Sequence, residues 1–279
     1  METRTVTASQ IQAFYKHLVC EEKSTATLEK YLRDVRAFCV FMGDRPVTKE
    51  SVVAYKKQLQ QRGYALRSIN SMLASVNSLL GFLGWQDCRV KFLKQQKQVF
   101  CPEEKELSKG EYLRLLEAAG KDRQLYLVMQ TICSTGIRVS ELRHFTLEQV
   151  RRGEITVDCK GKRRTILLPG KLRKLLLKYA EEEKIRSGLI FVNRNGNPLS
   201  RGSIWARMKA LCRTAGVNPK KVFPHNLRKL FARTFYGIEK DIAKLADILG
   251  HSSIDTTRIY IMTTGMEHRR KIEKLGLVL

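Results

Sequence analysis

Apolar residues recur through the first 85 residues at steps of three and four, the spacing of one face of an α-helix. One apolar stripe covers 11–18 and a second covers 28–42. Thr48 can cap a third helix, because its side-chain oxygen can accept a hydrogen bond from the first turn. A fourth helix is expected over 68–83, and we find no strand pattern in this region. The sequence therefore predicts a small four-helix domain over residues 1–94.

Beyond this domain the periodicity fades into a polar segment, which predicts a linker over 95–106. A second domain over 107–279 opens with Ser108 as a helix cap. Two short β-rich runs, 154–158 and 165–168, are joined by a basic loop over 159–164 that contains a glycine, which predicts a hairpin.

Residues 189–192 are a candidate third strand. The remaining helices are expected at 202–214, 225–236, 239–249, 255–261 and 265–275. The predicted fold class is mainly α with a small antiparallel β-sheet, in two domains.

Charge narrows the range of partners. The chain has 52 Lys and Arg residues against 27 Asp and Glu residues, a net charge of +25. Such an excess predicts a polyanionic partner, nucleic acid before an anionic membrane. The longest uncharged stretch, 68–86, carries too many Ser, Asn and Gln side chains for a membrane-spanning helix. No signal peptide is visible and the seven cysteines form no C-x-x-C pair, which predicts reduced thiols in a cytosol and no zinc site.

Four short segments carry candidate chemistry. They are Thr135–Leu142, which contains Arg138; Lys160–Lys162; His225–Arg228; and Leu249–His251, followed nine positions later by Tyr260. In this order they resemble the R…K…H-x-x-R…H…Y pattern of the tyrosine recombinase (phage integrase) family, and its Xer-type members most of all. Ser24–Tyr31 also resembles the opening of that family's N-terminal domain. The resemblance covers nearly the whole chain and implies a helical, SAM-like core-binding domain followed by an integrase-type catalytic domain.

These side chains suit an attack on a phosphodiester. A free phenol ionises with a pKa of about 10, so Tyr260 as a nucleophile needs a neighbouring base or a cationic field. Arg138 and Arg228 suit the negative charge that develops on the phosphate oxygens, because a guanidinium stays charged and donates a planar fork. His225 and His251 can donate hydrogen bonds to the same oxygens or take the tyrosine proton.

Lys160, on the loop of the predicted hairpin, suits a general acid that protonates the leaving 5′ oxygen. The family motif places its lysine before the loop glycine and favours Lys160, and Lys162 stays open as the alternative. Basic residues in and near this loop are predicted to contact the DNA backbone, where contacts set affinity and register but not sequence choice. They are Lys162, Arg163, Arg164 and Arg151.

The resemblance implies a 3′-phosphotyrosyl intermediate and a free 5′-hydroxyl, with no metal and no nucleotide cofactor. It also implies a C-shaped clamp on double-stranded DNA and a homo-tetramer on two DNA sites, with a monomer or dimer away from DNA. We expect no membrane partner and a cytoplasmic, nucleoid-associated location. Met266–Leu279 offers an apolar stripe and is a candidate for packing against a neighbouring protomer.

Each site residue also has an ordinary structural explanation. Tyr260 lies between two isoleucines and can be a packed aromatic, and His251 follows a glycine that can end a helix. Glu141 is predicted to be the structural partner of Arg138, three residues before it. Two other functions stay open: a DNA-binding regulator of the same fold that no longer cuts, and a monomeric type IB topoisomerase-like relaxase.

Overall fold

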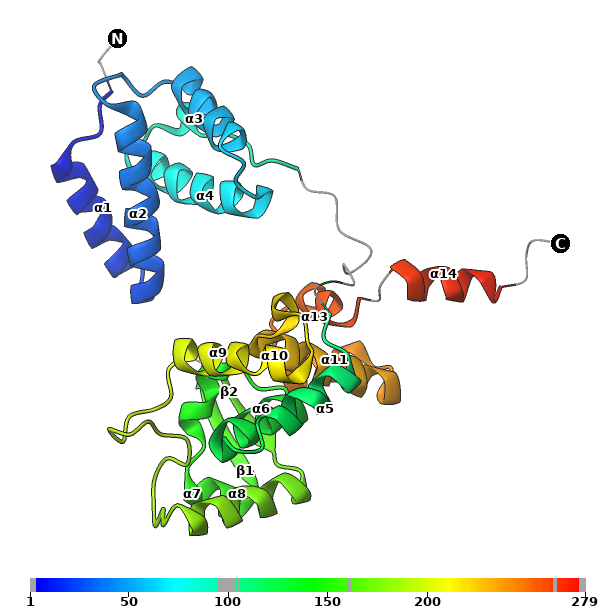
Figure 1. Cartoon of the computed structure of the whole chain (residues 1–279). Helices are drawn as coiled ribbons and strands as arrows, with labels where there is room; N and C mark the ends of the chain where they lie inside the picture. The colour runs from blue at the N-terminus through cyan, green and yellow to red at the C-terminus, as the bar shows by residue number, and fades with distance from the viewer. Residues whose placement is uncertain (1–3, 95–103, 105, 160–161, 263–264, 276–279) are drawn as a thin grey trace. The chain divides into compact units, whose positions relative to one another are not determined.

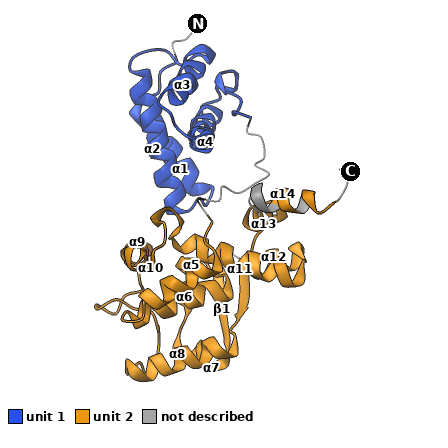
Figure 2. Ribbon diagram, turned by 45° about the vertical axis from the view of Figure 1, so that its right-hand side comes forward, with its two compact units in different colours: residues 1–97 blue, residues 98–279 orange. Residues whose placement is uncertain are grey.

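The computed structural model describes residues 4–94, 104, 106–159, 162–262 and 265–275 (Figure 1). Contacts divide the chain into two compact units, residues 1–97 and 98–279, which we call unit 1 and unit 2 (Figure 2). The predicted linker, 95–106, lies almost entirely outside the described residues, so its boundaries stay a prediction.

The described residues of unit 1 form four helices, as the apolar spacing predicts. They are α1 (Ala8–Cys20), α2 (Thr25–Met42), α3 (Lys49–Gln61) and α4 (Leu66–Phe82), followed by the 3₁₀ turn η1 (Gln86–Cys88). Thr48 caps α3, as predicted, by accepting a hydrogen bond from the backbone of Ser51. Phe14, Phe38 and Leu73 are completely buried between the helices. Burying each such side chain stabilises the fold by roughly 1.5–3 kcal/mol.

Unit 2 is mostly helical around one two-stranded sheet. Its elements are α5 (Lys109–Ala118), α6 (Arg123–Thr135), η3 (Val139–His144), α7 (Leu147–Arg152), β1 (Glu154–Cys159), β2 (Lys162–Leu167), α8 (Gly170–Glu182), α9 (Arg201–Ala210), α10 (Cys212–Ala215), η4 (Pro219–Lys221), α11 (Pro224–Glu239), α12 (Ile242–Leu249), α13 (Ile254–Ile261) and α14 (Gly265–Glu273). Ser108 caps α5, as predicted. Of the helices in the described ranges, none combines the length and the apolar content that crossing a membrane requires.

The hairpin is longer than the sequence predicts. β1 and β2 are antiparallel, and their register pairs Cys159 with Lys162. The loop expected over 159–164 is therefore wrong, because the residues from Lys162 onward belong to β2. Successive side chains of a strand point to opposite faces. Arg163 is accordingly exposed, whereas Arg164 is partly buried on the same face as Ile166.

The predicted third strand at 189–192 is also wrong. Two isolated bridges, Leu189 with Thr146 and Val192 with Pro198, take the place of a ladder. The apolar residues between these bridges are buried in the core of unit 2. A short apolar run does not distinguish a strand from a buried loop, and here core packing accounts for the pattern.

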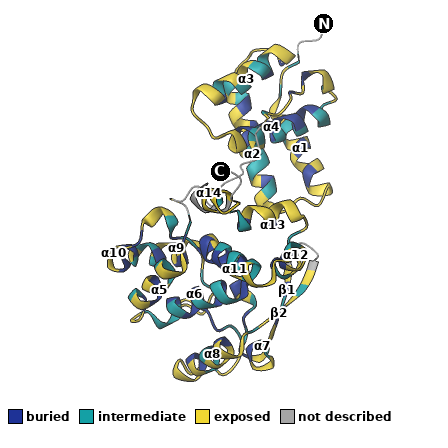
Figure 3. Ribbon diagram, turned by 90° about the vertical axis from the view of Figure 1, so that its right-hand side faces the viewer, coloured by how far each residue is buried: buried dark blue, intermediate teal, exposed yellow. Residues whose placement is uncertain are grey.

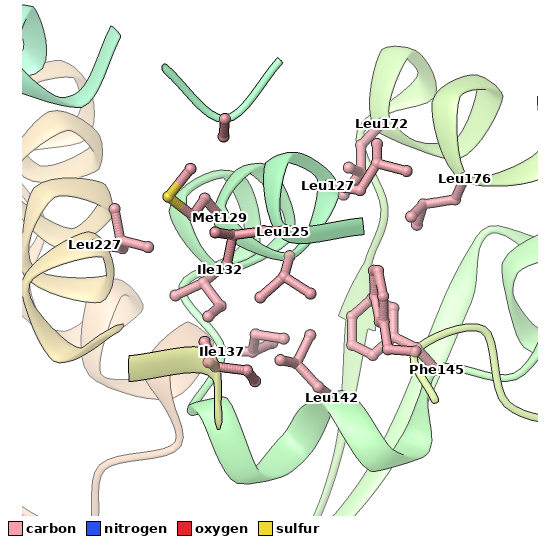
Figure 4. Close-up of a cluster of buried hydrophobic side chains, with 14 of the residues drawn as sticks. Leu125, Leu127, Met129, Ile132, Ile137, Leu142, Phe145, Leu172, Leu176 and Leu227 are labelled. Carbon is pink, nitrogen blue, oxygen red and sulfur yellow. The ribbon is translucent and has the colours of Figure 1, made fainter. Parts of the chain in front are cut away.

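The core of unit 2 forms around α6 (Figure 4). Leu127 and Ile132 of α6 are buried in one cluster with Phe145, Leu176 and Leu227. Leu227 belongs to α11, which packs against α6. This packing brings the first turn of α11 to the C-terminal end of α6.

A smaller buried cluster joins α11, α12 and α13, which also contact one another (Figure 3). It contains Ala232, Leu245, Leu249 and Tyr260. The predicted site residues of α11, the α12–α13 turn and α13 are thereby held on one packed group of helices.

Candidate active site

Two helix ends with glycine caps form the base of the site. Gly136 ends α6 with φ +65°, and Gly250 ends α12 with φ +62°, both in the left-handed region that glycine adopts most easily. A Cβ atom at position 136 would lie 2.3 Å from the ring of Phe231, so space also requires glycine there. The last carbonyl groups of each helix have no partner within the helix and are available to other donors.

Three arginines donate to the final carbonyls of α12. Arg164 Nη1 donates to the carbonyl of Ile248. Arg228 Nη2 donates to the carbonyl of Leu249 at 2.6 Å, and Arg138 Nη2 to that of Gly250 at 3.2 Å. Cations are favoured at a helix C-terminus, where the helix dipole is negative. The end of α12 therefore gathers three positive charges that the sequence places far apart.

Arg228 is the most deeply buried of these cations. Arg228 is 1% exposed, and its Nη1 donates to the carbonyl of Gly136 at the end of α6. Burial, together with the nearby charge of Arg138, lowers the pKa of Arg228 to about 10, so it stays protonated at neutral pH. Its Nε is buried without a hydrogen-bond partner among the described residues. A buried cation in this state favours an anion beside it.

Glu141 supplies the negative charge that holds two of the arginines. Its side chain lies 3.1 Å from Arg138 Nη1 and 2.6 Å from Arg164 Nη2, and it accepts the backbone N–H of Arg138 at 2.8 Å. Burial alone would raise the pKa of Glu141, but these contacts outweigh burial and lower it. The predicted pairing of Glu141 with Arg138 is confirmed.

His251 is held by a partner on each ring nitrogen. Nε2 lies 3.0 Å from Arg228 Nη2, and Nδ1 lies 2.9 Å from the hydroxyl of Thr257. A guanidinium only donates hydrogen bonds, so Nε2 accepts, and the ring proton is on Nδ1, which donates to Thr257. Burial and the charges of Arg228 and Arg138 lower the pKa of His251 to about 4. The ring is therefore neutral at physiological pH.

Tyr260 lies between the two histidines. Its ring centroid is 5.0 Å from that of His225 and 4.8 Å from that of His251. The guanidinium carbon of Arg228 lies 5.8 Å from the centre of the tyrosine ring. Burial, followed by the charges of Lys229 and Arg228, lowers the pKa of His225 to about 4. A neutral imidazole beside a phenol can accept its proton.

The structure thus gathers five of the six predicted catalytic residues in unit 2: Arg138, His225, Arg228, His251 and Tyr260. Lys160 lies outside the described residues.

The predicted DNA-backbone residues lie in different surroundings. Arg151 and Arg163 are exposed, whereas the side chain of Arg164 is only 14% exposed and turns toward Glu141. Lys162 begins β2. Its side chain lies outside the described part of the chain.

Sequence reasoning missed Thr257, a completely buried threonine that contacts His251. Its spacing three residues before Tyr260 puts both on one helix face, which is a weak signal by itself. Within the described ranges, no three His, Cys, Asp or Glu side chains gather as a metal site.

Comparisons with known proteins cover both units of the chain. The profile of the phage integrase family matches residues 105–265, and that of the phage integrase N-terminal SAM-like domain matches residues 11–87. Tyrosine recombinase XerA of Pyrococcus furiosus is 28% identical over 100% of this chain and 98% of its own length. XerA of Thermococcus kodakarensis is 31% identical over 95% and 94% of the two chains.

A solved structure shares the fold. It is that of a lambda integrase tetramer bound to a Holliday junction, with a TM-score of 0.74 and 20% identity over 92% of this chain and 77% of that one. The agreement extends over both units.

Proposed function

The chain belongs to the phage integrase family of tyrosine recombinases, and from this premise we propose that it cuts and rejoins duplex DNA with Tyr260 as the nucleophile. It is a site-specific recombinase, an enzyme that cleaves and rejoins DNA strands. The observation that carries the residue assignment is the position of the Tyr260 ring beside Arg228 and two neutral histidines of the same chain.

Strand cleavage exchanges one phosphate ester for another. The Tyr260 oxygen forms a bond to phosphorus, the bond from phosphorus to the 5′ oxygen breaks, and a 3′-phosphotyrosyl ester results. Arg138 and Arg228 stabilise the charge on the non-bridging oxygens, and one such arginine in phosphoryl transfer contributes about 10³–10⁵ in rate. Rejoining reverses the exchange, so no external energy source is needed.

The protons have separate routes. Both ring nitrogens of His251 are already engaged by Arg228 and Thr257. We therefore assign the proton of Tyr260 to His225, and give His251 the task of holding Arg228. Lys160 supplies the proton to the leaving 5′ oxygen, with Lys162 as the alternative.

A covalent adduct tests the nucleophile directly. Because the target sequence is not known, the probe is a pool of nicked duplexes with randomised sequence, from which denaturant-resistant protein–DNA adducts are isolated and sequenced. We expect adducts with the wild type and none with Tyr260→Phe. A wild type that binds DNA and forms no adduct would support the non-cleaving regulator instead.

Products distinguish the recombinase from a relaxase. Plasmids that carry two copies of the recovered site should yield recombinant molecules. Relaxation of supercoils without recombinants would favour the topoisomerase-like reading.

Duplex DNA is the polyanionic partner that the +25 charge calls for. Arg151 and Arg163 are exposed and suit contacts with the phosphate backbone, as does Lys162 at the start of β2. Replacing either exposed arginine with alanine should weaken binding to all sequences similarly and reduce the salt dependence of binding. A DNA substrate also agrees with the predicted cytoplasmic, nucleoid-associated location.

We propose that four protomers act on two DNA sites, and the lambda integrase tetramer bound to a Holliday junction supports an assembly of four. Ile272 and Leu275, near the end of the chain, are 54% and 61% exposed and offer an apolar contact for a neighbour. Deleting residues 266–279 should weaken assembly on paired sites more than binding to a single site. Gel-shift titrations measure both affinities, and an equal loss of the two would contradict this role.

A further inference from the structure

Arg164 differs from the other basic residues near the hairpin turn because its side chain is directed into unit 2. Its side chain is 14% exposed, and its Nη2 lies 2.6 Å from the Glu141 carboxylate. Its other terminal nitrogen donates to the carbonyl of Ile248 in the last turn of α12. A contact with the DNA backbone would require it to leave both partners.

Through Glu141, the position of Arg164 is connected to that of Arg138. One carboxylate oxygen of Glu141 accepts from both Arg164 Nη2 and the backbone N–H of Arg138. The other oxygen accepts from Arg138 Nη1 at 3.1 Å. Arg138 keeps a side chain that is 36% exposed, so it is held in place and still accessible to a phosphate.

Through α12, Arg164 is connected to the rest of the site. The carbonyl that follows Ile248 accepts from Arg228, and the next accepts from Arg138. A Cβ atom at Gly250 would lie 2.9 Å from Arg164 Cδ, so the stem of this arginine packs directly on the turn that leads to His251. The planar guanidinium of Arg164 thus holds the Glu141 carboxylate and the end of α12 together, which the single ammonium group of a lysine cannot do.

We propose that Arg164 is a positioning residue for DNA cleavage, which sets Arg138 and the end of α12 in the geometry that the phosphate requires, instead of binding the DNA backbone. This inference rests on the proposed function. The residue acts through Arg138, so its loss should resemble a partial loss of Arg138.

The test compares two nicked duplexes that share the sequence recovered by adduct selection and differ only in the group at the cleavage site. The first has the ordinary phosphodiester. The second has a methylphosphonate, in which a methyl group replaces one charged oxygen, so that less negative charge needs an arginine. Single-turnover adduct formation is measured at saturating DNA for the wild type, Arg164→Ala, Arg164→Lys and Arg138→Ala.

Arg173→Ala is the matched control. Arg173 also donates its guanidinium to the last carbonyls of a helix, those of Val150 and Arg151 in α7, and none of its hydrogen-bond partners in the described part of the chain is a proposed catalytic residue. The Arg173→Ala variant should have a lower melting temperature than the wild type and should cleave DNA at the wild-type rate.

We expect Arg164→Ala to slow cleavage of the phosphodiester by about 10- to 100-fold, the scale of a misplaced catalytic group. The defect should shrink on the methylphosphonate, as it should for Arg138→Ala. Arg164→Lys should recover part of the rate, because it restores one of the two contacts.

Three results would overturn the inference. They are a wild-type cleavage rate in folded Arg164→Ala, an equal defect on both cleavable groups, and a loss of DNA affinity at an unchanged saturated rate, which would restore the backbone-contact role. If Arg164→Ala does not fold, Arg164→Gln and Arg164→Lys are put through the same comparison. A wild type that forms no adduct with any DNA refutes the proposed function itself, and the inference with it.

Discussion

Among the residues that the structure describes, each unit has one deeply buried carboxylate, and the two serve different ends. Asp34 in unit 1 and Glu141 in unit 2 are each 2% exposed. Asp34 takes its cations from its own helix, Lys30 at 3.0 Å and Arg33 at 3.2 Å. It also accepts a hydrogen bond at 3.1 Å from Ser75 of α4. These ion pairs and this hydrogen bond join α2 to α4.

Glu141 joins parts of the chain that the sequence separates. Arg164 reaches it from the hairpin, and Arg164 and Arg138 both continue to the end of α12. The cations of Asp34 are 27% and 74% exposed, whereas those of Glu141 are 36% and 14% exposed. A buried carboxylate with cationic partners is therefore not by itself a sign of a functional site. Asp34 joins two helices, whereas the arginines bound to Glu141 also bind the end of α12 and so belong to the site.

The largest difference between the two units is expected when Arg228 is replaced and the rate of adduct formation is measured. Arg228→Ala should lower the rate of adduct formation by about 10³–10⁵, because the buried fork beside Tyr260 is lost. Arg228→Lys, which keeps the charge without the fork, should recover only part of it. In unit 1, Lys30→Ala should lower the melting temperature and leave the rate at saturating DNA unchanged. Similar rates of adduct formation for Arg228→Ala and Lys30→Ala would contradict this difference between the two units.

Neutralising each carboxylate gives the next largest contrast. Glu141→Gln leaves Arg164 with little water to solvate it, and breaking a buried pair of this kind costs about 3–5 kcal/mol. Asp34→Asn should cost less, about 1–3 kcal/mol, because water reaches its cations and the amide still accepts from Ser75. Urea unfolding gives both values, and adduct formation should be slowed in the Glu141 variant only.

The pH dependence of stability should also differ between the units. His225 and His251 have pKa values of about 4 in the folded state, below the value of about 6.5 expected when unfolded. Between these values the unfolded state binds more protons, so the free energy of unfolding of unit 2 falls as the pH decreases from about 6.5 to about 4. The contribution of Glu141, whose pKa is lowered, is lost only at still lower pH.

The two tryptophans make this measurable, since Trp85 belongs to unit 1 and Trp205 to unit 2. The lowered carboxyl pKa values of unit 1, those of Glu50 and Asp87, change its stability only in the more acidic range. Fluorescence-detected unfolding of Trp85→Phe and Trp205→Phe should show the mild-acid loss in unit 2 alone. His251→Asn should reduce this loss of stability without abolishing it, because His225 still contributes, and an unchanged slope would contradict the buried neutral His251.

Thr257→Val should have the smallest effect. It removes the acceptor for His251 Nδ1 at constant shape and costs about 1 kcal/mol of stability. Cleavage should slow by about tenfold, because His251 then holds Arg228 less firmly. Thr257→Ser should restore the rate, and the nitrogen chemical shifts of His251 should report the proton on Nδ1 in the wild type. A proton on Nε2 would contradict the hydrogen-bond assignment.

The helices could be predicted because their signals are local. The apolar spacing in 11–18 and 28–42 and the caps at Thr48 and Ser108 all act within a few residues, and the structure confirms them. The errors, the loop over 159–164 and the strand at 189–192, arose where backbone pairing and core packing decide the structure: β2 pairs with β1 as far as Lys162, and Leu189 makes only an isolated bridge with Thr146. Apolar composition is the same for a strand and for a buried loop.

The sequence by itself determined the family, the order of the reactive side chains and the pairing of Glu141 with Arg138, because these depend on residue identity and short spacing. Only the tertiary structure decided that Arg164 faces Glu141 and that Arg228 and Thr257 together determine the tautomer of His251. It also decided that the end of α12 collects three arginines. The physical reason is that burial, tautomer and charge sharing depend on groups brought together through space, which spacing along the chain does not specify.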